Sequence, residues 1–269
     1  MIEVKNIKKG FSGKTVINDV SAVMQTGKCN LIIGASGSGK TVMMKCMVGL
    51  FKPDSGDILY ENKSFTQMEL EEKKEVRKQI GMLFQGSALF DSQTVEQNIM
   101  FPLDMFTKDP YSKKLKRVNE VLARVELKDV NRKFPAELSG GMKKRVGIAR
   151  AIVLNPQYLF CDEPNSGLDP QTSLVIDKLI KEITSEYNIT TVINTHDMNS
   201  VMEIGDNIVY MYQGDKEWEG NREEIIFSKN DRLNEFIFAS EFLKDAKDMR
   251  MLEMSGKIVN DRNMDDLIK

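Results

Sequence analysis

The sequence predicts an α/β fold with a mainly parallel sheet and helices on both of its faces. Three observations lead to this prediction. Apolar runs of strand length alternate with longer segments of helical periodicity along most of the chain. A glycine-rich segment at residues 34–41 lies between a predicted strand and a predicted helix. Two carboxylates, Asp162 and Glu163, directly follow an apolar run, at the strand end where open α/β sheets bind ligands.

The first part of the chain contains three predicted strands and a helix. Residues 2–7 and 15–23 are predicted strands, and the second alternates apolar and polar side chains. Residues 30–34 form a short apolar strand that leads into the glycine-rich segment. Residues 40–50 repeat apolar side chains at helical spacing, and Gly49 lies near the predicted end. A strand, a glycine-rich turn and a helix in this order are what a phosphate-binding loop requires.

The rest of the chain repeats the strand and helix alternation around a long helical segment. A predicted strand at residues 80–84 precedes this segment, which occupies about 86–155. Further strands at 158–161, 190–195 and 208–212 and a helix at 172–186 follow. We therefore expect one domain over residues 1–227 with an inserted helical subdomain, and a partly helical C-terminal extension at 228–269.

Composition excludes some classes of function. Lys and Arg number 38 against 40 Asp and Glu, so no basic excess favours nucleic acid as a partner. The three cysteines lie far apart in apolar stretches, which indicates buried thiols in a reduced compartment and no metal pair. We expect no signal peptide, and no apolar run reaches the ~18–20 residues that span a bilayer. We expect a soluble protein that would serve a membrane process only through another polypeptide.

The segment at residues 34–41 fits the P-loop pattern. In such a loop successive backbone N–H groups point inward around an anion, and the dipole of the next helix adds to the attraction. Lys40 supplies a mobile positive charge for the β- and γ-phosphates, and the Thr41 hydroxyl is a hard oxygen ligand for Mg²⁺. The predicted ATP-binding residues of this loop are Gly34, Ser36, Gly37, Ser38, Gly39, Lys40 and Thr41.

Three polar residues after predicted strands are candidates for catalysis. Asp162 is placed to hold Mg²⁺, and Glu163 suits a general base that orients the attacking water. An acidic helix cap after a core strand is the alternative for both. His196, the one histidine of the chain, follows an apolar strand and can donate to the γ-phosphate or position the water. A structural or exposed histidine is the alternative there.

Three more candidates each have an ordinary alternative. Gln85 closes a predicted strand, where its amide can contact Mg²⁺ or the attacking water, although an exposed glutamine is by itself the better explanation. Asp169 lies just past the proposed base and is also explained as the cap of the next helix. Phe11, beyond the first predicted strand, can stack on adenine or pack in the core.

A second glycine-rich turn, at residues 138–142, also opens a predicted helix. Its Ser139, Gly140 and Gly141 offer backbone N–H groups and a helix N-terminus to an anion. One triphosphate cannot easily use both glycine-rich turns from a single chain of this layout. The pair of turns resembles that of the ATP-binding cassette family, in which the two turns of opposite subunits close over one ATP.

In this order the motifs resemble those of ATP-binding cassette ATPases over about residues 1–227. The motifs are the P-loop, Gln85, Leu138-Ser139-Gly140-Gly141, Asp162-Glu163, Asp169 and His196. The resemblance implies a P-loop NTPase (RecA-like) core with an N-terminal antiparallel β region and a helical signature subdomain. It also implies ATP and Mg²⁺ as cofactors and a homodimer of ATPase subunits.

The same resemblance implies a role for each motif. Thr41, Gln85 and Asp162 would surround the magnesium ion, Glu163 would be the base, and His196 would sense the γ-phosphate. Ser139 and Gly141 would reach the γ-phosphate bound by the opposite subunit, and Asp169 would cross the dimer interface.

At two positions this sequence departs from the family pattern. The aromatic residue near the adenine is usually tyrosine, and Phe11 lacks its hydroxyl. Asn194 replaces the apolar residue common before Thr-His, and no role is assigned to it.

A narrower resemblance begins in the strand before Gln85. Residues 82–92, followed by Thr94-Val95, Asn98-Ile99 and Phe101-Pro102-Leu103, are similar to the ATPases of Mla-type lipid transporters. Those ATPases work at the cytoplasmic face of the inner membrane with a permease and an Mce-domain protein, on phospholipids. Amino-acid importers and non-transport cell-division cassettes share much of this pattern and stay open as alternatives. A soluble cassette ATPase acting on DNA or ribosomes is the alternative from another class.

Two remaining segments are predicted surfaces. The charged run 69–78 and the triplet Lys143-Lys144-Arg145 are expected to be solvated helix faces. The extension has an apolar stretch that either packs on its own core or docks on the other subunit. Its residues are Leu233, Phe236, Ile237, Phe238, Phe242 and Leu243.

Overall fold

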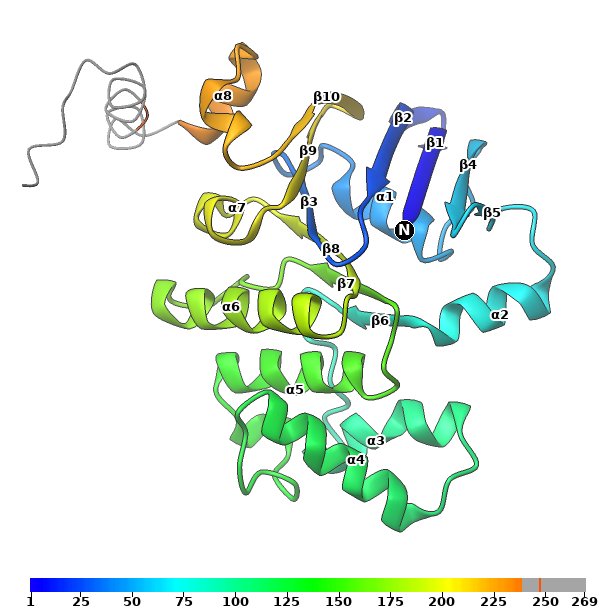
Figure 1. Ribbon diagram of the computed structural model, residues 1–269, viewed down its shortest axis with the longest axis vertical. Coiled ribbons are helices and arrows are strands. Elements are labelled where there is room, and N and C mark those ends of the chain that lie inside the picture. Colours follow the sequence, from blue (N-terminus) through cyan, green and yellow to red (C-terminus); the bar gives the residue numbers. More distant parts are fainter. Residues whose placement is uncertain (239–246, 248–269) are drawn as a thin grey trace, which may run out of the picture. The chain divides into compact units, whose positions relative to one another are not determined.

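The structure, a computed structural model, describes residues 1–238 and 247. The chain divides into two compact units, Met1–Arg222 and a second that begins at Glu223, and each is described by itself. The first unit contains a parallel sheet, an antiparallel sheet and the helices around them (Figure 1). This is the α/β architecture that the sequence predicts.

A six-stranded sheet lies at the centre of the first unit, with strand order β10-β9-β3-β8-β7-β6. The strands are β3 (Cys29–Ile33), β6 (Ile80–Leu83), β7 (Tyr158–Asp162), β8 (Thr190–Thr195), β9 (Asn207–Tyr212) and β10 (Asp215–Gly220). Its strand pairs are parallel except for the hairpin of β9 and β10. All residues of β3, β7 and β8 are buried, because parallel strands are covered on both faces.

The second sheet is antiparallel, with strand order β2-β1-β4-β5. Its strands are β1 (Ile2–Phe11), β2 (Lys14–Met24), β4 (Ser55–Tyr60) and β5 (Lys63–Ser64). Strand β1 continues past the predicted end at residue 7, because it pairs with β2 as far as the turn at Ser12 and Gly13. Phe11 pairs with Lys14 and so lies at the end of this strand, not beyond it as predicted.

Helix α1 (Lys40–Met47) shares one hydrophobic core with both sheets. Met43, Met44 and Met47 are fully buried in this core, where their flexible side chains fill the space between strands. The helix ends three residues before the predicted end at 50, and Gly49 follows with a positive φ of 75°. The first unit has three other helices outside the helical insertion: α2 (Leu70–Lys78), α6 (Pro170–Glu186) and α7 (Met198–Ile204). Helix α2 buries no residue, as its run of charges predicts.

The predicted helical insertion separates β6 from β7 along the chain (Figure 1). It contains α3 (Val95–Phe106), α4 (Tyr111–Arg124), the short 3₁₀ helix η1 (Pro135–Glu137) and α5 (Gly140–Ile152). Helix α3 begins at a capping box, in which Thr94 accepts from the Gln97 N–H and Gln97 accepts from the Thr94 N–H. Ser139 caps α5, since its hydroxyl accepts from the Met142 N–H at 3.3 Å.

In the second unit the described residues form the 3₁₀ helix η2 (Glu224–Phe227) and helix α8 (Asp231–Ile237). The Asn230 side chain caps α8 by accepting from the Leu233 N–H at 2.9 Å. Phe242 and Leu243 of the predicted apolar stretch lie outside the described residues. Among the described residues of the whole chain, no helix is long and apolar enough to span a membrane.

Candidate nucleotide-binding site

The P-loop joins the carboxyl end of β3 to the start of α1. Gly34, Gly37 and Gly39 have φ values of 148°, 81° and 105°, which residues other than glycine rarely adopt. A Cβ on Gly34 would lie 2.2 Å from the Met211 carbonyl oxygen, so the loop passes too close to β9 for any side chain. The turn therefore depends on glycine both for its conformation and for its space.

Lys40 is only 7% exposed and lies over this loop. Its Nζ donates to the carbonyl oxygens of Gly34 at 2.7 Å and Ala35 at 3.1 Å. Burial lowers the pKa of Lys40, and the nearby carboxylates of Glu163 and Asp162 oppose that shift. The ammonium group is thus held at the phosphate loop and within electrostatic reach of both predicted carboxylates.

Asp162 ends β7 and faces the start of α1. Its Oδ1 accepts from the Thr41 hydroxyl at 3.3 Å and from the Asn194 amide at 3.0 Å. A hydroxyl and a carboxylate are the hard oxygen ligands that Mg²⁺ prefers, so the residues fit this ion. The described residues contain no cluster of three or more His, Cys, Asp or Glu able to hold a metal. A magnesium ion here would need phosphate or water oxygens to complete its coordination.

Glu163 and His196 lie side by side after β7 and β8. Nδ1 of His196 is 2.9 Å from a carboxylate oxygen of Glu163. The His196 side chain is 65% exposed and that of Glu163 only 14%, so the pair borders solvent on the histidine side. Glu163 has a positive φ of 50°, a strained conformation for a residue with a Cβ, and its N–H donates to the Asn194 carbonyl at 3.0 Å.

Gln85 lies two residues past the end of β6, which pairs with β7. The side chain is exposed, and the carbonyl oxygen of Gln85 accepts from Lys144. Phe11 is 41% exposed and contacts the edge of the Phe51 ring, with 5.2 Å between the centroids. Both residues are near a solvent-facing surface, as their predicted roles require, but those roles stay predictions.

The second glycine-rich turn packs against the segment that contains Asp169. A Cβ on Gly141 would lie 2.6 Å from the Thr172 methyl group, and one on Gly140 would lie 3.3 Å from Leu168. Asp169 caps α6, accepting from the Thr172 N–H at 3.0 Å and hydroxyl at 2.6 Å, and these bonds lower its pKa. The capping alternative for Asp169 is therefore present in the structure. Its place at a dimer interface stays a prediction.

The prediction of a solvated Lys144 is wrong. Lys144 is only 5% exposed, and its Nζ donates to the carbonyl oxygens of Gln85 at 2.6 Å and Glu163 at 3.2 Å. Three adjacent basic residues suggested a surface, whereas the helical spacing places Lys144 on the buried side of α5 with Gly147 and Ile148. That spacing was the signal available in the sequence.

A buried polar cluster beneath Glu163 was also missed. The Asn165 amide donates to Asp177 at 2.8 Å and to the Ser200 hydroxyl at 2.9 Å. Burial raises the pKa of Asp177 to about 6, and the hydrogen bonds from Ser200 and Asn165 oppose that rise. The cluster ties the turn after Glu163 to α6 and to α7, the helix after His196.

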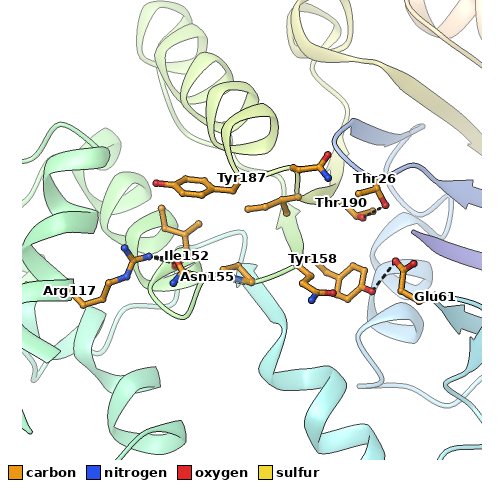
Figure 2. A pocket seen from close by; sticks show the side chains of 12 residues that line it. Thr26, Glu61, Arg117, Ile152, Asn155, Tyr158, Tyr187 and Thr190 are labelled. Carbon is orange, nitrogen blue, oxygen red and sulfur yellow. Dashed lines mark hydrogen bonds between the residues drawn. The ribbon is translucent and has the colours of Figure 1, made fainter. Parts of the chain in front are cut away.

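A separate pocket lies at the amino ends of β7 and β8 (Figure 2). Its volume is about 370 Å³, and its lining includes Arg117, Tyr158, Tyr187 and Thr190. Figure 2 shows Arg117 beside Ile152 and Asn155, and Tyr158 directed toward Glu61. None of the predicted site residues lines this pocket.

A glycine-rich loop between β3 and α1, a buried lysine over it and two carboxylates at the end of β7 define a P-loop nucleotide-binding protein. Comparison with known proteins gives the family. The family model for the ABC transporter domain matches residues 17–166. The chain belongs to the ABC transporter family, and this domain is an ABC-type ATP hydrolase.

Two relatives illustrate the breadth of this family. The chain is 36% identical over 236 residues to the probable ribonucleotide transport ATP-binding protein mkl of Mycobacterium tuberculosis, covering 88% of this chain. The match spans 66% of the length of that relative. The chain is also 37% identical over 261 residues to the methionine import ATP-binding protein MetN of Campylobacter jejuni, covering 91% of this chain and 78% of MetN.

Solved structures agree with the fold. The dimeric bacterial ABC transporter cassette MJ0796 superposes with a TM-score of 0.76 at 30% identity, covering 82% of this chain and 99% of MJ0796. A post-hydrolysis dimer of the same cassette, bound to ADP and Pi, gives a TM-score of 0.75. CbiO1 of Clostridium perfringens gives 0.78 at 30% identity, covering 93% and 98% of the two chains. The predicted cassette fold is confirmed.

Proposed function

We propose that this chain hydrolyses ATP with Glu163 as general base and His196 as its positioning partner. The observation that supports this most directly is the 2.9 Å contact of the two side chains beside the P-loop. A general base must lie within hydrogen-bond reach of the water it orients. His196 holds the Glu163 carboxylate at the strand end where the phosphates of a nucleotide on the P-loop would lie.

The other residues of the site stabilise charge. The glycine-rich loop and Lys40 bind the β- and γ-phosphates, because backbone N–H groups and an ammonium group neutralise the triphosphate. Thr41 and Asp162 would hold Mg²⁺, with Gln85 as the third proposed ligand, and the ion would offset charge on the transferred phosphoryl group. Phosphoryl transfer depends mostly on positioning and electrostatics, which these groups supply.

The active form that we propose is a homodimer with two shared sites. Ser139 is the N-cap of α5, and Gly140 and Gly141 begin the helix, whose first N–H groups have no partner within the helix backbone. In the dimer this turn meets the γ-phosphate held by the opposite P-loop, and Asp169 lies at the interface. The dimeric structures of MJ0796 support this arrangement. Hydrolysis followed by release of the phosphate removes the group that joins the subunits, and the dimer then opens.

A groove of about 400 Å³ is the proposed docking site for a membrane permease. It lies between β6, the segment after it, and helices α3 and α5. Phe84, Phe90, Phe101 and Phe106 line it, and each is at least 36% exposed, an unusual concentration of aromatic surface. An apolar segment from the cytoplasmic side of a permease fits this lining. The protein would then work as a peripheral subunit at the cytoplasmic face of the inner membrane.

For the cargo we propose phospholipid or another lipid moved between bacterial membranes, with an Mce-type protein as a further partner. The support is the likeness of residues 82–92 to Mla-type ATPases. The names of the two relatives point instead to ribonucleotide and methionine, so import of a small solute is the competing function. Purification from membranes with its partners distinguishes them, since co-purified lipid supports the first and lipid-free, solute-stimulated ATPase activity supports the second.

The test of the hydrolytic site is Glu163→Gln. The variant is expected to bind MgATP, to hydrolyse it about 10²–10⁴-fold more slowly, and to accumulate as a closed dimer. Steady-state ATPase assays and light scattering on a sizing column measure the two effects. Glu71→Gln, on the exposed α2, is the matched control and should behave as the wild type. Near-normal turnover of Glu163→Gln would remove the role proposed for Glu163.

A further inference from the structure

One face of α5 lies along the segment that follows β6. Lys144, Gly147 and Arg150, each three residues apart, form this face. A Cβ on Gly147 would lie 2.6 Å from a methyl group of Leu83 and 3.5 Å from Cβ of Ser87, so the helix approaches as closely as glycine allows. The two basic residues flank this point of closest approach.

Both basic side chains of this face donate to backbone carbonyls, which fixes the path of residues 85–88. Arg150 donates to the carbonyl oxygens of Ser87 at 2.6 Å and Ala88 at 2.7 Å. Ser87 and Ala88 have positive φ values of 62° and 44°, and such conformations persist only where neighbours hold them. Lys144 donates to the Gln85 carbonyl at 2.6 Å. Helix α5 is therefore hydrogen-bonded to both ends of this segment.

Lys144 differs from Arg150 because it also reaches the end of β7. Its Nζ donates to the Glu163 carbonyl at 3.2 Å. Burial lowers the pKa of Lys144, so the ammonium group needs the partners that it has. Glu163 is held in its left-handed conformation by its own N–H bond to Asn194 and by this bond to its carbonyl. The direction of the Glu163 side chain follows from that backbone conformation.

We propose that Lys144 is a positioning residue for hydrolysis, which couples the location of residues 85–88 to the orientation of the Glu163 carboxylate. One ammonium group joins both carbonyls, so a displacement of the segment after β6 changes the contact with Glu163. That segment also borders the aromatic groove through Phe84, Ala88 and Phe90. Occupation of the groove is thereby transmitted to the base through Lys144. The inference rests on the proposed role of Glu163.

The test compares Lys144→Met with Lys144→Arg in ATPase assays of the full chain. Lys144→Met keeps a long, buried side chain but loses both hydrogen bonds. Its kcat is expected to fall about tenfold, equivalent to about 1.4 kcal/mol in the barrier, while KM for MgATP changes less than about twofold. Lys144→Arg, which can donate to both carbonyls, is expected to recover most of the rate. Lys128→Met, on an exposed lysine of the same subdomain, is the control.

A second measurement separates positioning from folding. A second substitution, Lys144→Met, is added to the Glu163→Gln variant for this measurement. The fraction of dimer formed with MgATP should be the same in the single and the double variant, because Lys144 is not one of the proposed ATP-binding residues. If Lys144→Met has the kcat of the wild type, the inference is overturned. If Glu163→Gln is inactive in the same assay, the proposed function still holds. Active Glu163→Gln overturns both. A parallel loss of kcat, ATP affinity and melting temperature, without recovery in Lys144→Arg, shows a merely structural lysine and also overturns the inference.

Discussion

The two ends of strands β3, β7 and β8 differ sharply in what they hold. Their carboxyl ends lead into the P-loop, Asp162, Glu163 and His196, and two buried charged residues, Lys40 and Asp162, lie there. Their amino ends border a pocket of about 370 Å³ in which hydrogen bonds among Arg117, Asn155, Thr26 and Thr190 are ordinary side-chain contacts (Figure 2). The same strands thus support a chemical site at one end and a packing boundary at the other.

Unsatisfied buried atoms mark the difference. Among the described residues, four buried side-chain atoms have no hydrogen-bond partner, and three of them lie near the carboxyl ends: Ser38 Oγ, Asn165 Oδ1 and Asn194 Oδ1. Such groups are costly to bury and are rare in folded proteins. Their concentration indicates that this end of the sheet is shaped for something other than maximal stability.

The largest expected effect is on ATP affinity, and it contrasts two lysines that lie before and after β3 in the chain. Lys40→Met removes the ammonium group at the P-loop and is expected to weaken MgATP binding about 100-fold or more, since a charge-assisted contact to the triphosphate is lost. Lys28→Met, at the exposed amino end of the same strand, should change affinity less than about twofold. Titration calorimetry measures both. Equal affinities in the two variants would erase the functional contrast between the strand ends.

The next prediction concerns Asp177 in the buried cluster beneath Glu163. Its pKa rises from 3.8 to about 6 on folding, so the folded state holds a proton that the unfolded state has lost between these values. This contribution is fully present below pH 3.8 and is lost as the pH rises through 6. The loss amounts to about 3 kcal/mol in the free energy of unfolding. Asp177→Asn should lack that decline, as measured by denaturant unfolding between pH 4 and 7.5.

The free energy of unfolding of Asp169→Asn, measured over the same pH range, provides a comparison in which the expected pH dependence has the opposite sign. The pKa of Asp169 is lowered by the hydrogen bonds that it accepts, chiefly from Thr172. Its contribution is therefore present above its unfolded pKa and is lost as the pH falls. If Asp177→Asn showed the same pH dependence as the wild type, the cluster would not contain a proton-binding carboxylate.

The smallest effect is expected at the amino ends. Arg117 donates to the carbonyl oxygens of Val153 at 2.9 Å and Ile152 at 3.2 Å, and so joins α4 to the end of α5. Arg117→Met should lower the free energy of unfolding by about 1–3 kcal/mol without changing kcat. Lys116→Met, on an exposed neighbour, is the control for stability. A selective fall in kcat at unchanged stability would give the amino ends a catalytic role and overturn the contrast.

The sequence predicts the parallel sheet well for a physical reason. Strands β3, β7 and β8 are buried on both faces, and the apolar runs Leu31–Ile33 in β3 and Tyr158–Cys161 in β7 show this in the sequence. The same logic places Lys40, Asp162, Glu163 and His196 together, because parallel strands end at one edge. Strand β10 was not predicted, since its side chains are largely exposed and pairing with β9 alone defines it.

Long-range polar contacts escape such reasoning. Lys144 is buried because carbonyls from two distant segments, at Gln85 and Glu163, accept hydrogen bonds from its ammonium group. Asn165, Asp177 and Ser200 likewise come from three segments. The helical spacing of Lys144 indicates an interior position, but no local pattern of charge or hydrophobicity identifies the groups that accept its hydrogen bonds.

The placement of the helical insertion has a consequence for how such proteins diversify. Strands β6 and β7 pair directly at the margin of the sheet, although α3, α4 and α5 separate them along the chain. A loop that leaves and rejoins a scaffold at neighbouring points can be exchanged with little disturbance to the rest. Replacing residues between Leu83 and Tyr158 with the equivalent stretch of a relative would thus exchange the aromatic groove, Gln85 and the turn at Ser139 together, while the P-loop, Asp162, Glu163 and His196 stay unchanged.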